Sequence, residues 1–479
     1  MDYGSDSDGE IPDYDIDDEI DEPFPWDLES DQEDNNEEEE EEAERIYLNK
    51  AQDMEWTSKF HETGWDKNRQ KFSESEGSFN VDPMKIRTPK DAFVEFVDAE
   101  MLESITKYTN AEAVAAGDSK FKPVSSDEFL AWMSCSVAAG LMGANHTGAR
   151  ALWTTDTVYG SGFFRSVMSL ERYQAICKYV RFDDSVARRT PRQYGDQAKP
   201  TYTKSADRLA PIRPILELFR KNFRDKYSPG ENVAVDERIV SFRGRVEFRV
   251  YSKGKPDPYG IKVFGLSDAD SAYFSTFDVY TGKVGNTAEV GQGKRVVLQL
   301  TEPYIGSGRR VVFDNFFTSI PLCEELVERN LPCIGTLRKN KREIPVVVQD
   351  ALKDTAREVG SRLHVYHSEL MMTSYISKKN KHVIMLSTDP TVIPSESIAE
   401  VGTGAEKPAV VEMYNKYKGG VDLTDQHYTT LHCGYTLTTV AQCIISRDGQ
   451  CDQSLENVHS LRFRVQMSSA SLCRLFPNP

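Results

Sequence analysis

The segment RRVVFDNFFTSIPLCEELVERNLPCIGTL, residues 309–337, sets the fold because it places a helix between two short apolar runs. The runs RRVVFDNFF and LPCIGTL are typical of buried strands. Between them, a helix start is indicated at Ser319 by a capping serine, by Pro321 in the first turn and by the acidic residues that follow. The segment therefore predicts a strand, a helix and a second strand in succession.

Upstream of this segment the sequence adds three strands and one helix. The predicted strands are NVAVDERIVSF (232–242), YGIKVFGLSD (259–268) and AYFSTFDVY (272–280), and the predicted helix is EVGQGKRVVLQLTEPY (289–304). A three-strand meander followed by alternating helices and strands is the layout of an RNase H-like α/β core. We therefore expect this fold class, with a helical region before the core and a β-rich insertion inside it.

Composition and pattern divide the chain into six predicted parts. These are an acidic disordered tail and linker (1–90), a helical region (91–228), the first part of the core (229–345), the insertion (346–408), a helix that completes the core (409–430) and an atypical tail (431–479).

The net charge of −18 is unevenly distributed along the chain. Residues 1–45 hold 23 acidic residues against one arginine, and the remainder carries 53 acidic and 57 basic residues. The first segment lacks the apolar content for a core, so we expect a disordered tail that can bind basic partners.

Cysteine usage and hydropathy predict an intracellular, reduced and soluble protein with no membrane partner. The eight cysteines are scattered, and no signal segment opens the chain. The longest apolar stretch, residues 129–144, is shorter than the roughly 20 residues of a membrane span. It follows a capping box at residues 125–128, which favours a buried helix.

Acidic residues at three separate places indicate a metal-dependent site. Asp236 and Asp314 each follow an apolar strand run, and Asp422 and Asp425 lie three residues apart, on one face of a helix. The first two strands are neighbours in this fold, so the carboxylates would meet at one edge of the sheet. Two-metal phosphodiester cleavage needs such hard oxygen ligands. The alternatives are strand-end acids paired with local arginines and a solvated helix start.

Asp268, Asp270 and Asp278 lie in the same part of the chain but fit a structural role better. Their positions predict turns or exposed faces rather than a buried site.

Five blocks in order resemble the piggyBac transposases and their domesticated derivatives. The blocks are VDERIVSFRGR, KPDPYGIKVFGLSD, VVFDNFFTSIPL, GTLRKNKREIP and YNKYKGGVDLTDQ, supported upstream by LWTTD and FRSVMSLERYQAICKYVRFDDS. The resemblance covers residues 93 to 430. It implies a DDE-type catalytic site with Asp236, Asp314 and Asp422, two Mg²⁺ or Mn²⁺ ions and Asp425 as a further metal ligand. It also implies cut-and-paste transposition of DNA ends at TTAA targets, a homodimer, a nuclear location and a DNA-binding or dimerising helical region.

Basic residues flank the predicted active-site strands and would neutralise DNA phosphates. Of these, Arg338 and Lys341 match positions that the family uses on DNA; the alternative is a solvated basic surface. The predicted DNA-binding set is Arg243, Arg245, Arg249, Lys253, Lys255, Arg338, Lys339, Lys341 and Arg342.

The sequence departs from the piggyBac pattern after Gln426. The family's basic, tryptophan-containing stretch and long apolar helices are not recognisable there, so we expect a divergent or truncated C-terminus. The cysteines of this part have no C-x-x-C pair and do not indicate a zinc site. Two functions stay open at this stage: a DDE transposase, and a non-catalytic, domesticated protein that binds DNA or chromatin.

Overall fold

A computed structural model describes most of the chain between residues 44 and 424. The described residues are 44–61, 72, 77–142, 144, 147–155, 160–189, 207–242, 246–253, 258–283, 289–379, 381–394, 402–403 and 407–424. The predicted acidic tail up to residue 43 and the predicted tail 431–479 lie outside them. Within the described residues, no helix has the length and apolar character needed to cross a bilayer.

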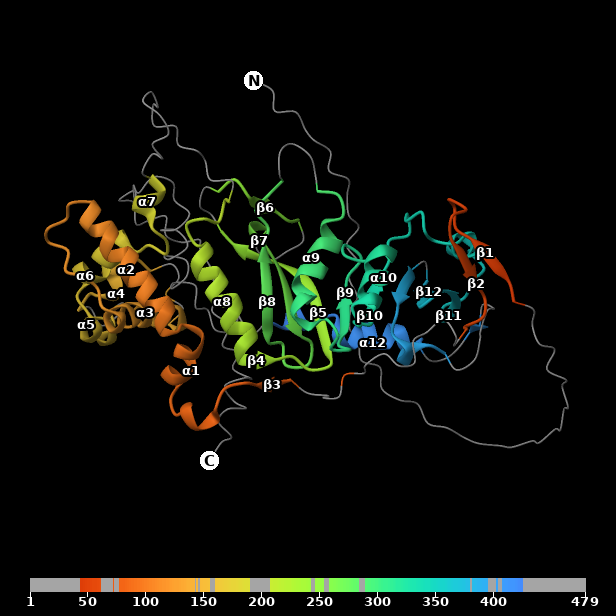
Figure 1. Ribbon diagram of the computed structural model, residues 1–479, viewed down its shortest axis with the longest axis horizontal. Coiled ribbons are helices and arrows are strands. Elements are labelled where there is room, and N and C mark those ends of the chain that lie inside the picture. The colour runs from red at the N-terminus through yellow and green to blue at the C-terminus, as the bar shows by residue number, and fades with distance from the viewer. Residues whose placement is uncertain are drawn as a thin grey trace, which may run out of the picture.

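The described residues between 89 and 226 are helical, as the sequence predicts, and most of their helices lie at one end of the molecule (Figure 1). Its helices are α1 (Pro89–Phe96), α2 (Ala99–Ala115), α3 (Ser126–Leu141), α4 (Ala149–Leu152), α5 (Gly162–Val167), α6 (Leu170–Tyr179), α7 (Ser185–Arg189) and α8 (Arg213–Lys226), and the 3-10 turn η2 (Pro83–Lys85) precedes them. At the start of α3, Ser125 accepts a hydrogen bond from the Glu128 amide, while the Glu128 carboxylate binds Arg172 instead of returning to the cap. Half of the predicted capping box is therefore formed.

Twelve of the described strands form one sheet. Its strands are β1 (Ile46–Leu48), β2 (Glu55–Thr57), β5 (Asn232–Ser241), β6 (Arg249–Tyr251), β7 (Tyr259–Asp268), β8 (Phe274–Val279), β9 (Arg310–Phe313), β10 (Cys333–Thr336), β11 (Ser361–His367), β12 (Leu370–Lys378), β13 (Lys381–Ser387) and β14 (Gly402–Thr403). The order is β1-β2-β11-β12-β13-β10-β9-β5-β7-β6, with β14 beside β11 and β8 beside β7. Two short strands, β3 (Ser78–Phe79) and β4 (Tyr227–Ser228), pair separately.

The centre of this sheet is the predicted RNase H-like core. Strands β5, β7 and β8 form the antiparallel meander, and β9 and β10 then add parallel to β5 on its other side. The crossover elements are α9 (Gln292–Thr301), the 3-10 turn η3 (Glu302–Tyr304) and α10 (Ile320–Glu328). The fold class predicted from the sequence is confirmed.

Three apolar cores hold the helices to the sheet. Alternate residues of β5 face opposite ways, so Val233 and Val235 pack with α9 and α10, whereas Ala234 packs with α12 (Ala409–Tyr417). The third core joins the helical region to the C-terminal part of β5, to the N-terminal part of β7 and to β8. The sheet is thus a layer between α9 and α10 on one face and α12 on the other.

Two predicted parts are more closely joined to the core than the sequence suggests. Residues 46–57, expected as linker, form the β1–β2 hairpin, which joins β11 through a Tyr366–Thr57 pair and buries Trp56 completely. The expected insertion begins with α11 (Val346–Lys353), includes the 3-10 turn η4 (Pro390–Val392), and extends the core sheet because β13 pairs with β10. The division into six parts otherwise stays a prediction.

Candidate active site

Asp236 and Asp314 lie side by side on two parallel strands. The last pair in the β5–β9 ladder is Val235 with Phe313, so each aspartate stands one residue further along its own strand. Their neighbours two residues back, Ala234 and Val312, both pack with α12. Residues two apart share a face, and adjacent strands are about 4.8 Å apart. Both carboxylates therefore face the α12 side of the sheet at neighbouring positions.

Asp314 is fixed by the turn that ends β9. Its carboxylate accepts a 2.8 Å hydrogen bond from the Phe316 amide, and its carbonyl oxygen accepts one from the Thr318 hydroxyl at 2.7 Å. Burial raises the pKa of Asp314, and the charge of Glu237 raises it further, whereas the Phe316 amide and Arg338 lower it. A cation at this position would offset the free-energy cost of burying the charged carboxylate.

Asp236 lies in the middle of β5 with a second acid beside it. Its carboxylate accepts a 2.7 Å hydrogen bond from the Glu237 amide. Glu237 in turn pairs with Lys262 at 3.0 Å, and both side chains are about four-fifths buried. Glu237 therefore has a cationic partner in the described structure, and that partner is on β7.

Asp422 lies in the segment that follows α12 and packs against the sheet. A Cβ at Gly420 would come within 3.0 Å of the Ala234 side chain, so glycine permits this close approach. The Thr424 hydroxyl bonds the Ala272 carbonyl at 2.8 Å and Val421 is fully buried, which anchors one face of the turn. Asp422 is left exposed, and Asp425 lies outside the described residues.

Tyr414 is close enough to three aspartates for their charges to affect its pKa, and it was not identified from the sequence. It is 7% exposed and packs in the core formed by α12 and the sheet. Burial raises the pKa of Tyr414 most, the charges of Asp314, Asp236 and Asp422 raise it further, and a hydrogen bond with Thr336 lowers it. Its hydroxyl is therefore within electrostatic reach of all three carboxylates. Its place in the YNKYKGGVDLTDQ block is the sequence signal from which Tyr414 could have been identified.

The donor set has the right chemistry for a divalent cation. Asp236 and Asp314 offer carboxylate oxygens, the ligands that Mg²⁺ and Mn²⁺ take in proteins, from neighbouring strand positions. Among the described residues, no group of three or more His, Cys, Asp and Glu side chains is close enough to hold a metal ion. The two strand aspartates are therefore the candidate metal ligands that the described structure places at neighbouring positions.

Among the described members of the predicted DNA-binding set, Arg338 is held beside Asp314 through Asn315. Its Nε donates to Asn315 Oδ1 at 3.1 Å, next to Asp314, and its side chain is exposed. Lys339, Lys341 and Arg342 follow in the loop after β10. Arg249 and Lys253 are exposed on and after β6, away from this loop, and Arg243, Arg245 and Lys255 lie outside the described residues.

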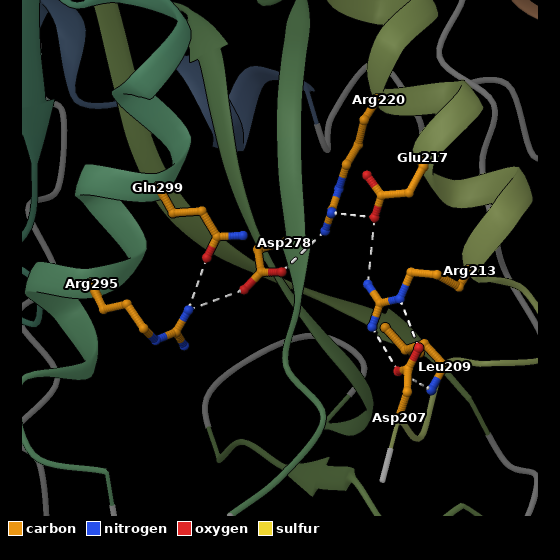
Figure 2. A network of polar contacts seen from close by, with 8 residues as sticks. All are labelled: Asp207, Leu209, Arg213, Glu217, Arg220, Asp278, Arg295 and Gln299. Carbon is orange, nitrogen blue, oxygen red and sulfur yellow. Dashed lines mark hydrogen bonds and ion pairs between the residues drawn. The ribbon is translucent and has the colours of Figure 1, made fainter. Parts of the chain in front are cut away.

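Asp268 and Asp278 have structural partners, but the prediction that they lie in turns or on exposed faces is wrong, because Asp268 is fully buried and Asp278 is 16% exposed within β8. Only Asp270 lies exposed in a turn, after β7. The Asp268 carboxylate accepts hydrogen bonds from the Tyr227 hydroxyl and the Gly230 amide. Asp278 lies between two helices, 3.0 Å from Arg220 of α8 and 3.6 Å from Arg295 of α9 (Figure 2). These acids join elements and do not face the candidate site.

A family model matches most of the chain and shows which family the protein belongs to. The model described as Transposase IS4 matches residues 88–447, about three quarters of the chain. The chain belongs to this transposase family. The match reaches 17 residues past the end of the sequence resemblance at 430, into the part predicted as an atypical tail.

The individual relatives are of piggyBac type, which confirms the resemblance. The human PiggyBac transposable element-derived protein 3 is 26% identical over 358 residues, which are 71% of this chain and 56% of that protein. The human PiggyBac transposable element-derived protein 2 is 20% identical over 58% of this chain and 46% of its own length. The chain thus spans about half the length of these curated relatives.

A solved structure supports both the relationship and the fold. The cryo-EM structure of the piggyBac transposase synaptic complex with hairpin DNA is 29% identical, with a TM-score of 0.61 and 81% of each chain covered. The transposase-type α/β core of this transposase-derived chain is therefore established.

Proposed function

We propose that this chain acts on DNA as a DDE-type transposase, with Asp236, Asp314 and Asp422 as the catalytic carboxylates and Asp425 as a further ligand. The observation that carries this proposal is the alignment of Asp236 with Asp314, one residue past the last pair of two parallel strands. Partial burial raises the pKa of Asp314, so this carboxylate is suited to a cation.

The residues have separate tasks in this proposal. Asp236 and Asp314 would hold two Mg²⁺ or Mn²⁺ ions with Asp422 and Asp425, and such ions stabilise the attacking and leaving oxygens of a phosphodiester displacement. Arg338, held by Asn315 beside Asp314, would bind a phosphate and align the scissile strand.

The finer properties of the reaction also belong to this proposal. The DNA would be transposon ends and TTAA targets, and the chain would act as a homodimer in the nucleus, with residues 91–228 contributing DNA binding and dimerisation. Support comes from the structural neighbour, whose complex contains hairpin DNA, and from the basic loop that begins at Arg338.

A second candidate is a domesticated, non-catalytic DNA-binding or chromatin protein. Two observations favour it: Asp422 is exposed, and among the described residues no three acids are close enough to share a metal. In this function the basic loop would bind phosphates, and the acidic tail would bind basic partners.

A cleavage assay separates the two candidates. The full chain is mixed with a DNA duplex that carries a transposon end, with Mg²⁺, with Mn²⁺ or with chelator, and nicked strands are resolved on a denaturing gel. We expect metal-dependent nicking that Asp314→Asn lowers by at least ~100-fold, because the ligand is lost. Asp350→Asn is the control, since Asp350 is an exposed residue of α11, a helix that contacts β1 and β12. DNA binding without nicking in either metal would refute catalysis and leave the second function.

A further inference from the structure

The β6–β7 ribbon exposes two tyrosines in contact with each other. Tyr251 and Tyr259 are direct cross-strand partners, with ring centroids 4.7 Å apart and a tilt of 49° between the planes. They are 59% and 42% exposed, although tyrosine rings are usually buried in part against a core. β6 is the last strand of the sheet path, so the pair stands at its edge. This arrangement leaves aromatic surface available to a ligand.

The surroundings of this tyrosine pair are cationic. The Arg249 guanidinium lies 5.8 Å from the centre of the Tyr259 ring, and Lys253, two residues after Tyr251, is exposed. The segment 243–255, which contains both strand β6 and this lysine, has five basic residues and one acid. Aromatic rings combined with basic side chains suit a polyanion that also has flat apolar faces, and nucleic acid has both features.

We propose that Tyr251 and Tyr259 form a stacking platform for an unpaired base of DNA. A base inside a duplex has both faces covered by its neighbours, whereas an unstacked base presents a free π-face. The edge position allows such a base to approach from outside the sheet. The basic side chains would hold the adjoining phosphates, which gives affinity without sequence choice.

The platform lies on the same face of the sheet as the candidate active site. Gly265 of β7 pairs with Asp236, and Tyr259 stands six residues before Gly265, so both β7 residues point to one face. Six residues of strand correspond to about 20 Å. The platform is therefore a separate contact point for the same DNA and not part of the metal site. The inference rests on the proposed function only in taking DNA as the ligand.

Binding of three labelled DNAs to the full chain tests this inference. The probes are a short duplex, the same duplex with an internal unpaired stretch, and a single strand, measured by fluorescence anisotropy in chelator over a range of salt. We expect tighter binding to the two probes with unpaired bases. Tyr251→Ala and Tyr259→Ala should each weaken binding to these probes roughly 5- to 100-fold, which is the effect of losing the stacking of one base. Both variants should bind the duplex as the wild type does.

Two control variants separate stacking from charge and from folding. Tyr259→Phe keeps the ring and should bind like the wild type. Lys253→Gln should weaken all three probes and lower the salt slope by about one, whereas the tyrosine variants should leave that slope unchanged. Thermal unfolding of every variant should match the wild type, since the rings are exposed.

Several outcomes would overturn the inference. Equal loss on duplex and unpaired probes, or no loss with Tyr251→Ala and Tyr259→Ala, would show that the rings do not stack on bases. A change of oligomeric state with unchanged DNA affinity would assign the pair to a protein contact. Absence of binding to any probe would remove both this inference and the proposed function, whereas intact binding without the tyrosine effect would remove the inference alone.

Discussion

Asp278→Asn should weaken the attachment of the helical region to the core. Asp278 of β8 accepts a hydrogen bond from Arg220 of α8 at 3.0 Å, and Arg295 of α9 approaches its other oxygen (Figure 2). The Asp278 and Arg220 side chains are only 16% and 12% exposed. The variant keeps the size of the side chain but removes the charge that two arginines share.

The magnitude follows from the burial of the pair. At 3.0 Å the attraction is about 5 kcal/mol for an effective dielectric constant of about 20, before desolvation is subtracted. Breaking a fully buried pair costs about 3–5 kcal/mol, and an exposed pair contributes about 0–1 kcal/mol. Arg220 keeps Glu217 at 2.8 Å and its contact with the Phe277 ring. We therefore expect a loss of about 2 kcal/mol in the free energy of unfolding.

Urea unfolding followed by circular dichroism measures this loss, and limited proteolysis reports whether α8 detaches first. The matched control is Asp350→Asn, since Asp350 pairs with Lys353 at 3.3 Å and the two side chains are 65% and 75% exposed. The control should unfold like the wild type. If both variants lose the same free energy, or if Asp278→Asn loses none, burial does not determine the strength of these pairs.

Two further predictions concern groups buried in the sheet. Burial lowers the pKa of His364 to about 4, below its unfolded value of about 6.5, so its contribution is complete above pH ~6.5 and is lost as pH falls toward 4. Between about pH 7.5 and about pH 5, the free energy of unfolding from urea titrations should therefore fall by about 2 kcal/mol less in His364→Asn than in the wild type. An equal fall in both proteins would contradict the burial of a neutral imidazole. Gly265→Ala would bring a Cβ within 2.0 Å of the Phe274 ring, which is buried, so we expect a loss of about 1–3 kcal/mol or more in the same titration. Gly162→Ala, where no atom lies within 4 Å of the added Cβ, is its control, and equal stability of the two variants would refute the steric argument.

The central strands and the two strand aspartates could be predicted because their signals are local. Val233 to Val235 and Val311 to Phe313 are apolar runs, and an acid at the end of each run is costly without a purpose. The order of strands and helices then determines that β5 and β9 are neighbours. The positions of Asp236 and Asp314 thus followed from short stretches of sequence and one topological rule.

The remaining features depend on contacts between distant parts of the chain. Trp56 lies in a three-residue strand whose partner residue, Tyr366, is more than 300 residues away, and no local pattern indicates that pairing. Strand β13 could likewise have belonged to a separate insertion, and only its register with β10 makes it part of the core sheet. Such choices depend on packing of whole elements, which alternation within one strand does not reveal.

Tyr414 shows how the same limit applies within the site. In the sequence it is one of two tyrosines in a short predicted helix, and its spacing favours a core position as much as a functional one. Its relation to the aspartates arises when α12 packs across β5, β9 and β10, with Gly420 close to Ala234 and Thr424 bonded to Ala272. The face of this segment that contacts the sheet is apolar or small, which leaves Asp422 on its exposed side. Docking of the helix, rather than the spacing of its acids alone, therefore determines which carboxylate can join those of the strands.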